Sequence, residues 1–225
     1  MASASERAVP PRLARFSRTE RVLHWTHAAS FFALLATGLI LYLPSLSTLV
    51  AQRQIVKNVH IWVAVAWAVA IVLILVLGDR RRLADDWREI ETIDRDDRRW
   101  LRRRRSPQGR FNAGQKVNAL LTVAFALLFL LSGFFLWLGE RDHRFILAGT
   151  GAVHDLLTLF SVLLLVGHLY LALIHPSTRH ALRGITVGDV DEDWARDHHA
   201  KWVEAERRSA LRQAAPVSTG DRVGE

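Results

Sequence analysis

The stretch HDLLTLFSVLLLVGH, residues 154–168, decides the fold. It begins and ends with histidine, and its only other ionisable residue is Asp155. A soluble helix of this length would present a polar face, and this stretch has none. An apolar helix of about 20 residues crosses a hydrocarbon core of about 30 Å. The stretch therefore predicts a membrane-spanning helix that carries two imidazoles.

Three further apolar stretches have the same character, so we expect an all-α membrane protein built as a four-transmembrane-helix bundle with a cytoplasmic loop and tail. The predicted spans lie at about 24–43, 59–78, 116–138 and 151–175. They divide the chain into a polar segment at 1–23, a transmembrane domain at 24–178 with a basic loop at 79–115, and a C-terminal segment at 179–208. Residues 209–225 lose the apolar periodicity and are expected to be disordered.

The basic residues lie mainly on one side of the predicted spans. The chain holds 30 Lys and Arg against 22 Asp and Glu, and 13 of the basic residues lie at 79–116, from the end of the second span to the start of the third. The positive-inside rule then places both termini and this loop in the cytoplasm. Because span-flanking arginines are accounted for by topology and anionic lipid, we do not expect nucleic acid as a partner.

The basic loop itself, 79–115, mixes both charge signs with scattered apolar residues. Two structures are compatible with that pattern: an amphipathic helix along the membrane surface, or a solvated charged linker.

The composition excludes several kinds of site. No cysteine is present, so the chain has no disulfide, no iron–sulfur ligands and no cysteine-attached haem. A catalytic zinc helix of the HExxH type is missing too. The N-terminal segment is polar, bears arginines and lacks a small-residue cleavage site, so we expect no removable signal peptide.

The histidines fall at matched depths in the predicted topology. His24 and His168 lie toward the cytoplasmic side, and His60 and His154 toward the outer side. Fourteen residues of helix return to within about 40° of the same face and rise about 21 Å, so His154 and His168 point the same way at two depths. A b-type haem iron takes one imidazole from each side of its ring, and bundle interiors hold haem between facing helices. The two pairs therefore predict two b-type haems enclosed by the bundle.

Other histidine roles remain open. A histidine in a membrane helix can also serve only in hydrogen bonding between helices, although ionisable groups at this depth are costly and usually functional. His27, one turn after His24, is an alternative ligand. Four other histidines are expected outside the bundle interior: His175 at the interface, His143 in an outer loop, and His198 and His199 in the cytoplasm.

The stretch GRFNAGQKVNAL, residues 109–120, leads into the third span. Asn112 is a predicted helix N-cap with Gln115 at the reciprocal position, and Gly114 permits close approach to the backbone. The stretch also lies at the depth of the His24–His168 pair, where amide and backbone donors could bind a quinone carbonyl. The capping and quinone interpretations both remain open.

Six motifs point to a known family. They are RVLHW, KNVH, FNAGQK, VHDLL, VGHLY and RGITVGDVDEDWARDHHAKW. From about residue 16 to residue 202, the chain resembles the gamma, or cytochrome b, subunit of membrane-bound respiratory formate dehydrogenase, a relative of the cytochrome b561-like dihaem proteins. The tail motif and FNAGQK are the more specific elements, because histidine-bearing spans recur in many cytochromes b.

The resemblance implies two haems b and a quinone, menaquinone or ubiquinone, as electron acceptor. The iron ligands would be His24 and His168 for the cytoplasmic-side haem, and His60 and His154 for the outer-side haem. The quinone contacts would fall on Asn112 and Gly114, with Gln115 beside them and His168 close by.

The resemblance also implies partners. Formate would be oxidised by a separate molybdenum or tungsten alpha subunit, and an iron–sulfur beta subunit would pass electrons to the outer haem, the inner haem and then the quinone. This chain would be the electron-transfer and quinone-reducing subunit, with no formate-oxidising site of its own. The alternatives are the cytochrome b subunit of a membrane hydrogenase or another quinone-reactive oxidoreductase, and, from another class, a haem-free scaffold or transporter. Asp155 is unassigned: we expect it either to pair with Arg141 or Arg144, or to tune the outer haem.

Overall fold

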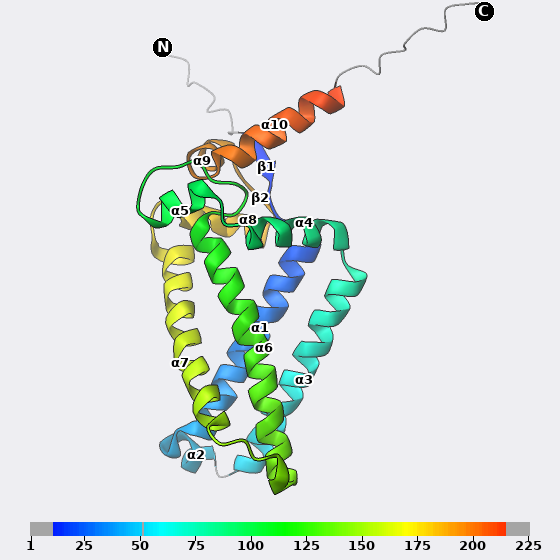
Figure 1. The fold of residues 1–225 in the computed structure, drawn as a ribbon, viewed down its shortest axis with the longest axis vertical. Helices are drawn as coiled ribbons and strands as arrows, with labels where there is room; N and C mark the ends of the chain where they lie inside the picture. Colours follow the sequence, from blue (N-terminus) through cyan, green and yellow to red (C-terminus); the bar gives the residue numbers. More distant parts are fainter. Residues whose placement is uncertain (1–10, 51, 215–225) are drawn as a thin grey trace, which may run out of the picture.

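The computed structural model describes residues 11–50 and 52–214. Four long helices stand side by side in a bundle (Figure 1): α1 (Arg18–Tyr42), α3 (Arg53–Leu77), α6 (Ala113–Arg141) and α7 (Thr150–Leu169). A π-helical turn, η2 (Tyr170–Ile174), extends α7. Each of the four is long and apolar enough to cross a membrane, which confirms the predicted all-α membrane bundle.

The helices extend beyond the apolar stretches. α1 begins at Arg18 and α3 at Arg53, several residues before the predicted spans at 24 and 59. At the start of α1, Ser17 Oγ accepts a hydrogen bond from the Glu20 amide, and Glu20 accepts one from the Ser17 amide. This capping box satisfies free amide groups, so a polar turn can precede the apolar segment.

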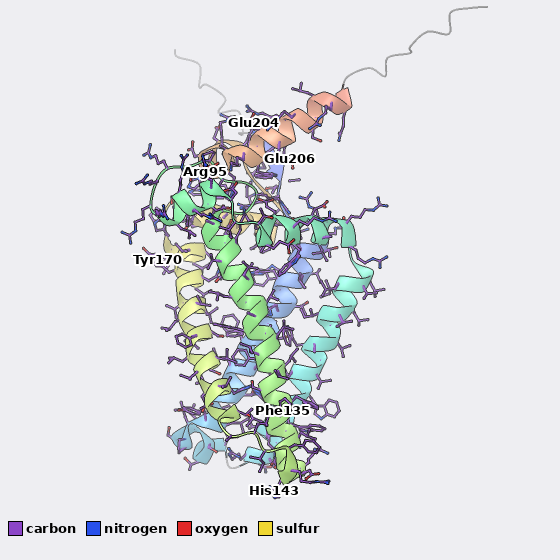
Figure 2. The ribbon with its side chains drawn as sticks, in the orientation of Figure 1. Arg95, Phe135, His143, Tyr170, Glu204 and Glu206 are labelled. Carbon is purple, nitrogen blue, oxygen red and sulfur yellow. The ribbon has the colours of Figure 1, made fainter. Side chains whose placement is uncertain are left out.

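The bundle consists of two helical hairpins. α1 packs along α3, and α6 packs along α7. The first hairpin turns through α2 (Pro44–Val50) and the second through η1 (His143–Phe145), at the end of the bundle that we call the short-loop end. There Lys57 of α3 forms an ion pair with Glu140 of α6, which ties the hairpins together. His143 lies at this end, far from Glu204 and Glu206 at the opposite end (Figure 2).

The opposite end, which we call the basic end, comprises residues 11–17, 78–112 and 175–214. It contains the remaining elements: β1 (Arg12–Ala14), α4 (Arg80–Glu91), α5 (Arg95–Leu101), η3 (Arg179–Ala181), α8 (Leu182–Thr186), β2 (Asp189–Asp191), α9 (Glu192–His198) and α10 (Ala200–Ala214). β1 pairs antiparallel with β2, so the N-terminal segment is joined to the tail. This small sheet was not predicted. Beside it lies a core of Val190, Ala195, Trp202 and Val203.

The basic loop forms two short helices rather than one amphipathic helix or an unstructured linker. Asp79 accepts a hydrogen bond from the Arg82 amide at the start of α4, and Asp94 forms a capping box with Asp97 at the start of α5. α4 crosses the end of the bundle (Figure 1).

The tail remains helical past the expected boundary at 208, because α10 continues to Ala214. The rest of the stretch that was expected to be disordered, 215–225, lies outside the described residues.

A buried polar network holds the basic end together. Arg110 pairs with both Glu20 and Asp86, and its Nε donates to the Arg15 carbonyl at 3.1 Å. Arg15 in turn donates to the Arg110 carbonyl at 2.9 Å and to His199 Nε2 at 2.9 Å. Buried charges are tolerated when they are paired and hydrogen-bonded. The network therefore joins the N-terminal segment, the basic loop and the tail.

His199 is a buried member of this network, a role that the sequence did not indicate. Its Nδ1 lies 2.7 Å from the Gly109 carbonyl, which can only accept, so Nδ1 carries the proton. Its Nε2 then accepts from Arg15, which can only donate. Burial, reinforced by the charge of Arg15, lowers the pKa of His199 to about 3, so the ring is neutral.

Candidate functional site

The bundle brings together two pairs of histidines. The ring centroids of His24 and His168 lie 6.2 Å apart, with 49° between the ring planes. Those of His60 and His154 lie 6.5 Å apart, with 63° between the planes. In each pair one ring comes from the α1–α3 hairpin and the other from α7, so α7 contributes one histidine to each pair.

The separations suit an ion held between two imidazoles. A coordinating imidazole nitrogen lies about 2 Å from a first-row metal ion, with its ring centroid about 1 Å further back, so two opposed ligands place their centroids about 6 Å apart. Both observed separations match this value. Because the two rings of a pair belong to different hairpins, a planar haem would fit between the hairpins rather than within one. The donor set and spacing therefore fit two bis-histidine haems.

The polar surroundings of the two pairs differ. His60 Nδ1 lies 2.8 Å from Thr37 Oγ1, and His154 Nδ1 lies 2.9 Å from Ser132 Oγ. In the other pair, His24 Nδ1 is buried and has no hydrogen-bond partner among residues 11–50 and 52–214. Sequence reasoning missed Thr37 and Ser132, because single hydroxyl residues in apolar helices are common.

The competing histidines lie elsewhere. His27 packs against Phe31 and Trp67, with ring centroids 6.3 and 5.7 Å away, which favours His24 as the partner of His168. His175 follows η2 at the basic end, where its Nδ1 lies 3.2 Å from Ser177 Oγ.

The expected ion pair of Asp155 does not form in the described part of the chain. Arg144 binds Asp142 at 2.7 Å, and Arg141 lies over the Trp137 ring, 4.3 Å from its centroid. Both arginines are engaged locally, so Asp155 is left exposed.

The FNAGQK stretch adopts the predicted cap. Asn112 Oδ1 accepts from the Gln115 amide at 2.9 Å, and Gln115 Oε1 accepts from the Asn112 amide at 3.0 Å. Gly114 is covered: a Cβ at this position would lie 3.1 Å from the Trp100 ring. The Gly114 backbone therefore meets Trp100 of α5 at close range, and its expected contact with a quinone stays a prediction.

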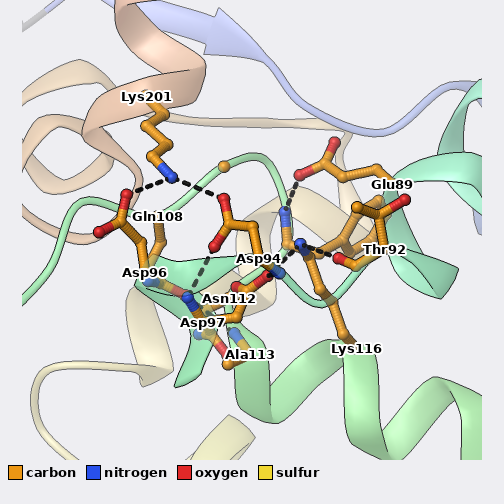
Figure 3. Close-up of polar contacts among 12 residues, drawn as sticks. Glu89, Thr92, Asp94, Asp96, Asp97, Gln108, Asn112, Ala113, Lys116 and Lys201 are labelled. Atoms are coloured by element: carbon orange, nitrogen blue, oxygen red, sulfur yellow. Dashed lines mark hydrogen bonds and ion pairs between the residues drawn. The ribbon is translucent and has the colours of Figure 1, made fainter. Parts of the chain in front are cut away.

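The cap leaves one amide group of Asn112 available. Its Oδ1 is engaged, whereas its Nδ2 has no hydrogen-bond partner within the described ranges. Ion pairs surround this helix start (Figure 3): Lys116 binds Asp97 at 2.8 Å, and Lys201 of the tail bridges Asp94 and Asp96. The hydrogen bond from Lys201 holds Asp94 ionised, and the pKa of that carboxyl is lowered to about 2.

Comparison with known proteins agrees with this architecture. Residues 15–188 match the model of the family described as prokaryotic cytochrome b561. The formate dehydrogenase cytochrome b556(fdo) subunit of Escherichia coli strain K12 is 24% identical over 216 residues, covering 90% of this chain and 97% of the relative. The formate dehydrogenase cytochrome b556 subunit of Haemophilus influenzae is 23% identical, covering 95% and 92%.

A third relative is less similar and covers nearly as much of the chain. The nitrate-inducible formate dehydrogenase cytochrome b556(Fdn) subunit of Escherichia coli strain K12 is 21% identical, covering 87% of this chain and 92% of the relative. The match of the family model extends over all four spans and both histidine pairs. The chain belongs to the prokaryotic cytochrome b561 family and is a multi-pass membrane cytochrome b.

Proposed function

We propose that the chain is the dihaem cytochrome b subunit of a formate dehydrogenase, and that it delivers electrons to a quinone at the basic end of the bundle. The proposal rests on one observation: two pairs of histidine rings face each other in the bundle, and α7 contributes one ring to each pair. When bound, the haems supply one-electron transfer between the two ends of the bundle. The names of the relatives support formate dehydrogenase as the parent complex.

In this proposal four histidines hold the two haem irons. His60 and His154 hold the haem near the short-loop end, and His24 and His168 hold the haem near the basic end. The basic end faces the cytoplasm, because it carries the arginine-rich loop and tail. The bacterial inner membrane is the proposed location.

The quinone would bind at the start of α6. Asn112 would donate its unused Nδ2 to a quinone carbonyl while Oδ1 continues to cap the helix, and Gln115 would hold Asn112 in place through the capping box. Protons for the reduced quinone would come from the cytoplasmic side. Quinone reduction at this face, with electrons entering at the other, would help to generate a proton motive force.

Formate oxidation would take place in partner subunits. A molybdenum or tungsten alpha subunit would oxidise formate, and an iron–sulfur beta subunit would dock at the short-loop end and pass electrons to the His60–His154 haem. A membrane hydrogenase would use the same bundle with hydrogen as electron source. Reconstitution of the complex with formate or with hydrogen as the electron donor distinguishes the formate dehydrogenase from the hydrogenase.

The first test is a haem count. The purified chain is reduced with dithionite, its difference spectrum is recorded, and haem is quantified per polypeptide as the pyridine haemochrome. Two b haems per chain are expected. Folded protein that has been purified with its partners and carries no haem would overturn the proposal.

A further inference from the structure

Thr37 and Ser132 occupy matching positions in the two hairpins. Each lies on the first helix of its hairpin, each is followed by glycine, and each is bonded to a histidine of the second helix. The distances are 2.8 Å from Thr37 Oγ1 to His60 Nδ1 and 2.9 Å from Ser132 Oγ to His154 Nδ1. The following glycines lie beside the same rings: a Cβ at Gly38 or Gly133 would stand 3.5 or 3.6 Å from the Cε1 of its histidine.

The direction of both hydrogen bonds follows from where the hydroxyl protons go. Thr37 Oγ1 donates to the Ala33 carbonyl at 2.8 Å, and Ser132 Oγ donates to the Leu128 carbonyl at 2.7 Å. A hydroxyl has one proton, and a carbonyl can only accept. The short distances to the carbonyls favour this use of the proton, in which the hydroxyl oxygens present lone pairs to the rings and each histidine donates from Nδ1.

This direction fixes the tautomer of both rings. In a neutral imidazole only one nitrogen carries a proton, so an Nδ1 that donates leaves Nε2 as the free lone pair. His60 and His154 are thus both prepared to bind a metal ion through Nε2. The His24–His168 pair has no such support, since His24 Nδ1 is buried without a partner and His168 has no ring hydrogen bond in the part of the chain that the structure describes.

We propose that Thr37 and Ser132 are positioning residues that set His60 and His154 as Nε2 ligands and lower the reduction potential of the haem they hold. The inference rests on the proposed function, because it requires a haem between these rings. An imidazole that donates a hydrogen bond is a more basic ligand and stabilises the oxidised iron. The haem at the short-loop end would then have a lower potential than the haem at the basic end, so electrons would move toward the quinone end spontaneously.

The experiment measures two midpoint potentials by spectroscopic redox titration of the haem-loaded complex. Thr37→Val and Ser132→Ala keep the approximate side-chain shape and remove the hydroxyl. Each is expected to raise the potential of the haem held by His60 and His154 and to shift its electron paramagnetic resonance signal. The potential of the other haem is expected to stay unchanged. The affinity for that haem is expected to fall about 10- to 100-fold. Thr37→Ser and Ser132→Thr keep a hydroxyl and are expected to restore the wild-type values.

Thr122→Val is the matched control, because Thr122 Oγ1 donates to the Asn118 carbonyl at 2.8 Å and, within the described residues, forms no hydrogen bond with a histidine. It is expected to leave both potentials unchanged. The inference is overturned if both potentials are unchanged in Thr37→Val and Ser132→Ala, or if Thr122→Val shifts them equally. If Thr37→Val loses a haem, Thr37→Ser gives the decisive result. Retention of the haem in Thr37→Ser supports the role of the hydroxyl, and loss of the haem overturns the inference. Wild-type protein without haem would instead overturn the proposed function.

Discussion

His60 on α3 and His154 on α7 face each other with ring centroids 6.5 Å apart, although they belong to different hairpins. His24 and His168 repeat the arrangement at 6.2 Å, nearer the basic end. The second member of each pair lies on α7, where fourteen residues of helix return the side chain to nearly the same face. One helix therefore sets the depth and the direction of both candidate haem sites.

Replacing one α7 histidine should remove one haem and leave the other. His168→Ala is expected to reduce the haem content from two per chain to about one, because the His60–His154 pair lies at another depth and keeps both rings. Haem per polypeptide is measured as the pyridine haemochrome. His27→Ala is the control and should retain both haems, since its ring packs against Trp67 rather than His168. Two haems in His168→Ala would show that the assigned pairing is incorrect.

Asn112 allows helix capping to be separated from quinone binding. Asn112→Asp keeps the capping oxygen but removes the Nδ2 donor, so the helix should remain stable while quinone reduction slows, by about 10-fold for one lost hydrogen bond of about 1.4 kcal/mol. Quinol formation is measured by stopped flow with both haems pre-reduced. Asn112→Ala loses cap and donor together and should also lose about 1 kcal/mol of stability. Wild-type rates in Asn112→Asp would assign the residue to capping alone.

The basic end should loosen in acid because of His199. An exposed histidine titrates near about 6.5, whereas burial and Arg15 lower the pKa of His199 to about 3. Between these values the unfolded chain binds one more proton than the folded chain. The free energy of unfolding should therefore be highest above about pH 6.5 and fall by up to about 1.4 kcal/mol per unit as the pH drops toward 3.

Thermal unfolding of the basic end, followed by tryptophan fluorescence at pH 7 and pH 5, measures this dependence. His199→Gln should be less stable at pH 7 and less sensitive to pH. Equal pH profiles for His199→Gln and the wild type would contradict the assignment.

Lys116 and Asp97 form a buried ion pair at 2.8 Å, with side chains only 7% and 3% exposed. Lys116→Met leaves the Asp97 carboxylate buried without its partner and should cost about 3 to 5 kcal/mol of stability. Adding Asp97→Asn removes the stranded charge and should recover much of the loss. Chemical denaturation measures all three variants.

Arg88 and Asp85 provide the exposed comparison, with side chains 74% and 68% exposed. Arg88→Ala should change the stability by less than about 1 kcal/mol. A Lys116→Met effect no larger than that of Arg88→Ala would show that the Lys116–Asp97 pair contributes little.

The sequence predicted the features that depend on position along a single helix. Apolar length identifies a span, and the spacing of His154 and His168 places both on one face at two depths. The helix cap at Asn112 and Gln115 was readable for the same reason, since its partners are three residues apart. These properties are local, and tertiary contacts did not change them.

Only the tertiary structure decided which distant groups meet. Thr37 lies beside His60, Ser132 beside His154, and His199 is buried against Arg15, all through packing between separate elements. Trp100 covers Gly114 because α5 folds back over the start of α6. The sequence by itself therefore determined the spans and the depths of the histidines. The fold alone decided their hydrogen bonds, because a hydrogen bond depends on distances of about 3 Å between residues that no sequence period relates.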